Sequence, residues 1–368
     1  MKRSIVLTTT AAVVAAMALA GCSSSAPASS GGSSSAAATS AASSAASSAA
    51  SSAGSSAATS GSAGSSSAES SVAAPSSASK NYNISFIQGV AGDEFYISMQ
   101  CGIEAEAARL GVTVNTQGAQ KFDPTLQKPI VDSVVSSKPD AILIAPTDVT
   151  AMQRPLADAA AAGIKVVLVD TTTEDPSFAA SQVSSDNIGG GAAAFDAIKE
   201  LHPDGGKLLV ISVDPGISTT DARVKGFEDA AAADSKFSYV GVQYSHNDPA
   251  TAAQLVTAAL QKDPDIVGIF ATNLFAAEGT STGVKQAGKG SELSIVGFDA
   301  GPNQVKALKD GTVQALVAQR PAQIGTDGLD QAVAALDGGT VTPKIQTGFE
   351  IITADNVDSS DAVYQSSC

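Results

Sequence analysis

The stretch "IVGFDAGPN", residues 295–303, carries the pattern that decides the fold. A short apolar run ends on a carboxylate, Asp299, and Pro302, a residue suited to the first turn of a helix, follows closely. The stretch "VVLVDTTTED", residues 166–175, repeats this arrangement and places Asp170 directly after its own apolar run. Apolar runs without polar alternation are typical of parallel strands that are covered on both faces. The two stretches therefore predict buried parallel strands that each end on an aspartate.

The rest of the chain from Asn81 onward alternates short apolar runs with longer segments of helical spacing. The two successive blocks of this pattern predict an α/β protein with two doubly wound parallel-sheet lobes. Strands are expected at residues 84–88, 112–115, 141–145, 165–169, 207–213, 238–244, 266–271, 294–298 and 313–318. Ligands of such folds bind where the carboxyl ends of the strands meet. Asp170 and Asp299 are therefore expected to face a ligand, although capping of a helix N-terminus is an alternative role for each.

The beginning of the chain has the layout of an export signal. Met1, Lys2 and Arg3 form a basic start, an apolar run follows, and "LAGC" at residues 19–22 resembles the lipobox of bacterial lipoproteins. This resemblance predicts a signal peptide over residues 1–21 and a lipid on Cys22. Residues 22–79 are almost wholly Ser, Ala and Gly, which predicts a disordered tether. The protein is therefore expected outside the cytoplasm, anchored by lipid to the cell membrane.

Charge and composition exclude several classes of function. The net charge of -15 argues against nucleic-acid binding and against stable attraction to an anionic lipid surface. The two histidines are far apart in the sequence, and no metal site or cofactor is predicted. Cys101 and Cys368 are an even pair in an exported chain, which favours a disulfide, and two unrelated thiols are the alternative.

A family resemblance extends over residues 82–352. The stretches "ISFIQGVAGDEFYISMQCGIEAEAARLG", "AILIAPTD", "SSDN", "DARVKGF" and "IVGFDAGPN" resemble the periplasmic sugar-binding proteins of the ribose-binding type, which are the solute receptors of ABC importers. The resemblance implies a type I periplasmic binding protein fold, with lobes joined by three hinge crossings near residues 185–187, 319–320 and 347–349. It implies an N-terminal lobe of residues 80–185 plus 320–347, and a C-terminal lobe of residues 186–319 plus 348–368.

The same resemblance implies a set of ligand-binding residues. Carboxylates and amides bond sugar hydroxyls, an arginine fork spans two hydroxyls, and aromatic faces pack on a sugar ring. The expected residues are Asp93, Phe95, Tyr96, Asp170, Thr171, Arg223, Asn247, Asn273, Phe298, Asp299 and Gln319. For Phe95 and Tyr96, the alternative is a place on the core-facing side of the following helix. For Arg223, the alternative is an ion pair on the surface.

Two departures bear on the ligand. Ala145 and Thr171 stand where the ribose-binding relative has an asparagine and an arginine, which disfavours ribose and favours another sugar or an inositol-like polyol. The sequence does not name that ligand.

The leading hypothesis for function is a monomeric, lipid-anchored receptor without catalytic residues. It would capture a neutral monosaccharide or polyol and deliver it to a permease and ATPase of the ABC type. A receptor of the same fold that presents a signal molecule to a membrane sensor is the alternative. "GTSTG" at residues 279–283 fits the nucleophile elbow of hydrolases, but its serine lies well beyond the preceding strand and both histidines precede it. A hydrolase is therefore disfavoured.

Overall fold

The computed structural model describes residues 74–368. The predicted signal peptide, Cys22 and most of the predicted tether lie outside these residues. The last part of the tether segment is packed, because the Ala78 amide donates to the Leu110 carbonyl and Arg109 bonds the Pro75 carbonyl. Ordered contacts with the first lobe therefore begin near Pro75, a few residues before the expected boundary at residue 80.

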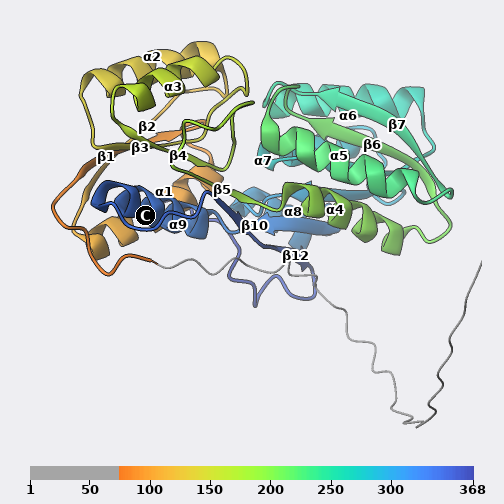
Figure 1. Ribbon diagram of the computed structural model, residues 1–368. Helices are drawn as coiled ribbons and strands as arrows, with labels where there is room; N and C mark the ends of the chain where they lie inside the picture. Colours follow the sequence, from red (N-terminus) through yellow and green to blue (C-terminus); the bar gives the residue numbers. More distant parts are fainter. Residues whose placement is uncertain (1–73) are drawn as a thin grey trace, which may run out of the picture. The chain divides into compact units, whose positions relative to one another are not determined.

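The first lobe is built on a six-stranded parallel sheet (Figure 1). In the order in which they hydrogen-bond, its strands are β11 (Lys344–Thr347), β5 (Ser181–Ser185), β4 (Lys165–Val169), β3 (Ala141–Ile144), β1 (Asn83–Gln88) and β2 (Thr113–Gly118). The direction of chain connection reverses between β1 and β3, so loops diverge there at the carboxyl ends of the strands. This divergence opens a place for a ligand.

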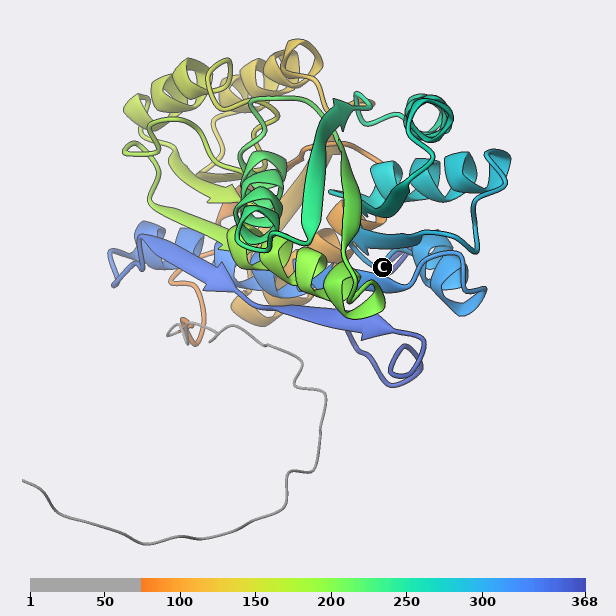
Figure 2. The same ribbon diagram turned by 90° about the vertical axis from the view of Figure 1, so that its right-hand side faces the viewer.

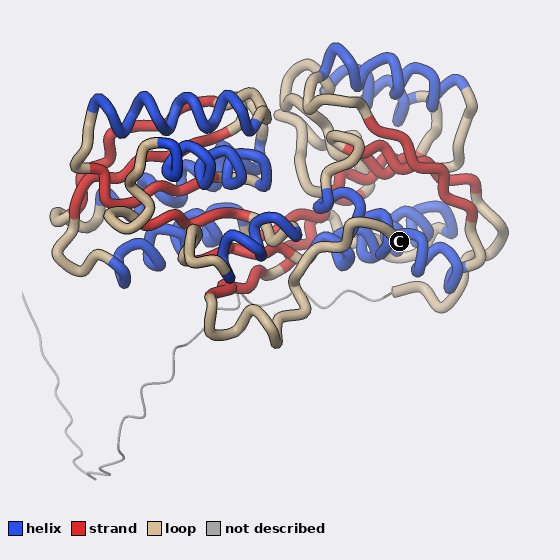
Figure 3. Tube along the Cα trace, turned by 180° about the vertical axis from the view of Figure 1, so that it is seen from behind, coloured by secondary structure: helices blue, strands red, loops and turns tan. Residues whose placement is uncertain are grey.

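Helices cover both faces of this sheet (Figure 3). The helices of the first lobe are α1 (Glu94–Leu110), α2 (Pro124–Ser136), α3 (Gln153–Ala161) and α9 (Pro321–Asp337). The helices α1 and α9 pack together on one face, and α2 and α3 pack on the other. A Cβ atom added at Gly102 would lie 2.1 Å from the Ala322 carbonyl oxygen, so glycine lets the backbones of α1 and α9 approach closely.

The second lobe repeats this plan. Its sheet contains β12 (Phe349–Thr353), β10 (Ala315–Gln319), β9 (Ser294–Phe298), β8 (Ile266–Ala271), β6 (Gly206–Ser212) and β7 (Phe237–Tyr244), in order of pairing. All neighbours are parallel except β12, which runs antiparallel to β10. The strands β4 and β9 thus occupy the same place in their two sheets.

The sheet of the second lobe lies between two layers of helices (Figure 2). Its helices are α4 (Asn187–Leu201), α5 (Ser218–Ala232), α6 (Pro249–Lys262), α7 (Leu274–Gln286) and α8 (Pro302–Lys309). The helices α4 and α5 pack together on one face, and α6, α7 and α8 cover the other. Buried Val, Ile, Leu and Phe side chains fill the space between the layers, which is the main stabilising contribution in a fold of this kind. The two doubly wound lobes expected from the sequence are therefore present.

The chain passes between the lobes at several points. It leaves the first sheet after β5 and enters α4, returns after β10 through Arg320 into α9, and crosses again between β11 and β12. The segment after β12 then runs back to α1, where Cys368 forms a disulfide with Cys101. Residues 365–368, which the sequence grouped with the C-terminal lobe, therefore contact the first lobe.

Within residues 74–368, no helix is both long and apolar enough to cross a lipid bilayer.

Candidate functional site

A cavity lies between the two lobes at the carboxyl ends of their strands. All the predicted ligand residues except Thr171 and Phe298 line it. Its lining consists of Asp93, Phe95, Tyr96, Phe122, Asp170, Val213, Ile217, Thr219, Thr220, Arg223, Asn247, Asn273, Asp299 and Gln319. Both lobes contribute, so a ligand held there contacts both of them at once.

The two strand-end aspartates occupy equivalent positions. Asp170 follows β4 and Asp299 follows β9, and both have a positive φ, 64° and 79° respectively. Each backbone amide still pairs with the next strand, since Asp170 donates to the Val183 carbonyl and Asp299 to the Val317 carbonyl. A left-handed conformation is unusual outside glycine and is best tolerated by Asp and Asn. The bend therefore ends each strand and directs a carboxylate into the cavity instead of the core.

Three hydrogen bonds hold the Asp299 carboxylate. Its Oδ1 atom accepts from Gln319 Nε2 at 2.7 Å and from the Tyr364 hydroxyl at 2.9 Å. Its Oδ2 atom accepts from the backbone amide of Leu274 at 2.9 Å, which is the first residue of α7. The helix-capping alternative considered for Asp299 is thus realised in part, but the helix is α7 and not the α8 helix that follows Asp299 in sequence.

The first lobe supplies two further acids. The Tyr96 hydroxyl donates to Asp170 Oδ2 at 2.8 Å, and the Asp93 carboxylate caps α1 by accepting from the Phe95 amide at 2.8 Å. Burial raises the pKa of Asp170 to about 6, although the charge of Arg223 and the Tyr96 hydroxyl oppose this. Burial, followed by the charge of Asp299, raises the pKa of Asp93 well above its ordinary value. The carboxyl groups of Asp93 and Asp170 therefore retain their protons to higher pH than exposed carboxyl groups do.

Arg223 is the cation of the cavity, and it is 3% exposed. Its Nε donates to Asn187 Oδ1 and one terminal nitrogen donates to the Thr272 carbonyl, both at 2.8 Å. The guanidinium carbon lies 3.8 Å from the ring centroid of Phe298. The alternative of a surface ion pair for Arg223 is excluded by this burial. The other N–H groups of the fork can donate to ligand hydroxyls.

Two predicted ligand residues are placed differently from the expectation. Phe298 is fully buried and supports the Arg223 guanidinium instead of lining the cavity. Successive residues of a strand point to opposite faces, so the residue before Asp299 enters the helix-covered core. The Thr171 hydroxyl donates to the Pro146 carbonyl at 2.7 Å, because the bend at Asp170 turns the next side chain back toward the loop after β3.

The amides predicted in the second lobe lie together. Asn273 caps α7 by accepting from the Ala276 amide, and its Nδ2 donates to Asn247 Oδ1 at 2.7 Å. Asn247 has a φ of 54°, which places it at a tight turn after β7. Both residues line the cavity, and their remaining amide groups can serve as donors or acceptors for hydroxyls.

Aromatic and apolar side chains complete the wall. The rings of Phe95 and Tyr96 meet edge to face with centroids 5.1 Å apart. A Cβ atom at Gly89 would lie 2.3 Å from the Tyr96 hydroxyl oxygen, so only glycine leaves room for this tyrosine. Phe122 and Ile217 were missed by the sequence analysis. Phe122 follows the end of β2, so the same rule of strand ends could have identified it.

Loops of the two lobes contact each other at the entrance of the cavity, and we call these loops the cavity lips. The Val149 amide of the first lobe donates to the Gly216 carbonyl of the second at 3.0 Å. Nearby, the Thr172 amide donates to the Ser218 hydroxyl at 2.9 Å. The structure therefore corresponds to a closed arrangement of the two lobes.

Two α/β lobes that close over a polar cavity at their strand ends define a two-lobed solute-binding protein. Residues 84–340 match the family described as "Periplasmic binding protein domain", and the chain belongs to this family. The resemblance inferred from the sequence is thereby confirmed.

Relatives of known description agree with this assignment. A ribose import binding protein of Bacillus subtilis is 31% identical over 283 residues, which cover 76% of this chain and 91% of the relative. A solved ABC transporter solute-binding protein of Agrobacterium vitis, bound with α-D-tagatopyranose, is 39% identical with a TM-score of 0.76 and covers 77% of this chain and 100% of its own. A second from the same organism, with bound D-fucose, is 32% identical with a TM-score of 0.74 and the same coverage. These relatives are binding proteins and not enzymes.

Proposed function

We propose that this protein binds one neutral monosaccharide between its lobes and delivers it to an ABC permease, which a cognate ATPase drives. The observation that carries the proposal is the convergence of Asp93, Asp170, Asp299 and Arg223 on one buried cavity that both lobes line. The relatives that bind tagatose and fucose support the class of ligand.

The chemistry of the cavity suits a polyhydroxylated, uncharged guest. Sugar hydroxyls donate to carboxylate oxygens and accept from the Arg223 fork and the Asn273 amide. The raised pKa values of Asp93 and Asp170 limit the negative charge that the empty cavity carries. An anionic ligand would add to the repulsion among the acids, and a cationic ligand would compete with Arg223. A neutral sugar avoids both costs.

Binding is coupled to closure in this proposal. The lobes comprise residues 80–185 with 320–347 and residues 186–319 with 348–368, apart from the end of the chain that joins α1. Opening breaks the contact between Val149 and Gly216 and admits the sugar, and contacts from both lobes then favour the closed form. The permease recognises the closed form.

The proposed ligand is a six-carbon sugar or deoxysugar in its ring form in preference to ribose. Ala145 and Thr171 lack the amide and the cation of the ribose-binding relative, and the Thr171 hydroxyl is occupied by the Pro146 carbonyl. Losing partners for buried hydroxyls costs about 1–3 kcal/mol each. Ribose is therefore expected to bind more weakly than a ligand matched to the cavity.

A calorimetric titration against D-tagatose, D-fucose, D-ribose and the anionic sugar D-glucuronate tests the proposal. We expect binding of one neutral sugar per chain and none of D-glucuronate. Asp299→Asn is the matched variant, because asparagine tolerates the positive φ while removing the charge. It should weaken binding by about 10- to 150-fold, since a hydrogen bond to a charged group contributes about 1.5–3 kcal/mol.

A surface substitution serves as the control. Asp196→Asn, on the exposed side of α4, removes one charge far from the lining and should leave the sugar affinity unchanged. Unchanged affinity of Asp299→Asn for a sugar that binds the wild type would remove Asp299 from the site. Absence of binding to a full panel of neutral monosaccharides would refute the proposed ligand class.

Anchoring to the membrane is part of the proposal. The "LAGC" stretch supports cleavage before Cys22 and attachment of lipid to its thiol, with residues 23–79 linking the anchor to the lobes. The receptor then works close to the permease as a monomer.

A further inference from the structure

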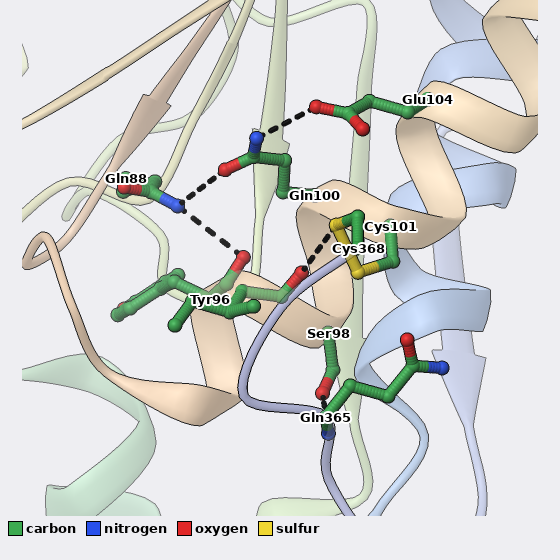
Figure 4. The surroundings of a disulfide bond; sticks show 9 residues. Gln88, Tyr96, Ser98, Gln100, Cys101, Glu104, Gln365 and Cys368 are labelled. Carbon is green, nitrogen blue, oxygen red and sulfur yellow. Dashed lines mark hydrogen bonds between the residues drawn. A yellow bond between two sulfur atoms is a disulfide. The ribbon is translucent and has the colours of Figure 1, made fainter.

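The C-terminal segment, residues 354–368, connects the two lobes a further time. It starts at the end of β12 in the second lobe and ends at the disulfide between Cys368 and Cys101 of α1 (Figure 4). Just before that bond, the Gln365 amide donates to the Ser98 hydroxyl at 2.7 Å. We call these residues the C-terminal strap. The strap lies outside residues 84–340, the part that matches the family.

Tyr364 of the strap lies outside the cavity and contacts residues that line it. Its side chain is buried and does not line the cavity. Its hydroxyl donates to Asp299 Oδ1 at 2.9 Å and accepts from the Gln319 backbone amide at 3.1 Å. Its ring centroid lies 5.9 Å from that of Phe95. One side chain thus contacts cavity-lining residues from both lobes.

We propose that Tyr364 is a positioning residue for sugar binding, and that the disulfide between Cys101 and Cys368 keeps it in place. The inference rests on the proposed function, because the residues that Tyr364 holds are those assigned to the sugar. No residue of the strap itself needs to touch the ligand.

The partners of the Tyr364 hydroxyl determine the direction in which its proton points. A phenol has one proton, and its oxygen already accepts from the Gln319 amide, so the proton points to Asp299. Burial and the charge of Asp299 raise the pKa of Tyr364 well above its ordinary value, so the phenol remains a donor at physiological pH. Without this donor, the Asp299 carboxylate loses one of its three fixed partners and the Gln319 amide loses its acceptor. Both residues then adopt the binding geometry less often.

The disulfide matters because few other contacts hold the end of the strap. Tyr364 lies four residues before Cys368, and its amide donates to the Ala300 carbonyl at 3.0 Å. The contact between Gln365 and Ser98 is a single hydrogen bond. Cys101 is on the same helix as Phe95 and Tyr96, so the covalent bond also ties the strap to the aromatic wall of the cavity. Opening the disulfide leaves the strap held to that helix only by non-covalent contacts, the hydrogen bond of Gln365 to Ser98 and the ring contact of Tyr364 with Phe95.

The test compares sugar affinity in Tyr364→Phe and Tyr82→Phe, using a neutral sugar that binds the wild type. Tyr82 is an equally buried tyrosine of the first lobe whose hydroxyl bonds Asp337 away from the cavity. We expect Tyr364→Phe to weaken binding about tenfold, and Tyr82→Phe to lower the melting temperature without changing the dissociation constant. In Tyr364→Phe, hydrogen exchange at the Gln319 amide should also accelerate, a readout that needs no sugar.

A double variant, Cys101→Ser with Cys368→Ser, tests the coupling to the disulfide. It should weaken binding several-fold in the wild-type background and produce little further loss in the Tyr364→Phe background, because both changes remove the same constraint. Equal affinity of Tyr364→Phe and wild type, or equal losses in the Tyr364 and Tyr82 variants, would overturn the positioning role. Additive losses would overturn the coupling. A wild type that binds no monosaccharide would overturn the proposed function and, with it, this inference.

Discussion

Replacement of Asp170 by asparagine should change how the stability of the protein depends on pH. The pKa of Asp170 is raised from its ordinary value of 3.8 to about 6, mainly by burial. A raised carboxyl pKa means that the folded protein holds the proton more tightly than the unfolded chain. The free energy of unfolding therefore falls as pH rises from below 3.8 through about 6. Asparagine carries no such proton and accepts the φ of 64°.

The size of the effect follows from the two pKa values. Their difference corresponds to about 3 kcal/mol of stability lost in total on going from low to high pH. Linkage places about 1.4 kcal/mol of this loss between pH 5 and pH 8, and the rest below pH 5. The stability of Asp170→Asn relative to wild type should accordingly increase by about 1.4 kcal/mol over that interval. Loss of the Asp170 charge, which interacts electrostatically with Arg223, adds an offset, so the slope with pH, and not the absolute difference, is the quantity to compare.

Urea unfolding of the sugar-free protein at pH 5, 6, 7 and 8 measures this slope. Asp196→Asn, exposed on α4, controls for removal of one negative charge from a chain of net charge -15. Curves for wild type and Asp170→Asn that remain parallel between pH 5 and pH 8 would refute the argument, because they would show that burial does not retain a proton on Asp170.

Two further predictions concern Phe298 and Cys22. Phe298→Leu should weaken sugar binding by up to about 30-fold in calorimetry although the residue does not line the cavity, because a buried cation–π contact with Arg223 contributes about 2 kcal/mol. Unchanged affinity would show that Arg223 keeps its position without the ring. Cys22→Ser should move the protein from the membrane fraction to the soluble extracytoplasmic fraction, as followed by detergent phase partitioning. A variant that stays with the membrane would contradict lipid attachment at Cys22.

Much of the fold could be predicted because its sequence signals are local. An apolar run such as Val166–Val169, without polar alternation, indicates a strand buried on both faces, and the alternation with helical spacing indicates parallel crossovers. The rule that ligands bind at the carboxyl ends of strands then identified Asp170 and Asp299, and the family resemblance added Asn273; all three line the cavity. These residues needed no knowledge of the distances between elements.

The structure differs from the expected placement where the direction of a side chain depends on the backbone. Phe298 and Thr171 adjoin the two aspartates in sequence, but strand alternation turns the first into the core and a left-handed residue turns the second to the Pro146 carbonyl. Tyr364 could not be found from strand ends, because it follows Asp299 by 65 residues and arrives on a segment without regular structure. The pairing of Cys101 with Cys368 was the sequence feature that pointed to this segment.

The contact that joins the cavity lips has a consequence for how receptors of this kind diversify. The bond between Val149 and Gly216 uses main-chain atoms only. Substitution of the side chains around the cavity leaves this hydrogen bond intact, because every residue except proline has a backbone amide that can donate and every residue has a backbone carbonyl that can accept. Ligand preference can therefore drift through substitutions at the wall while the closing movement, and the shape offered to the transporter, are inherited unchanged.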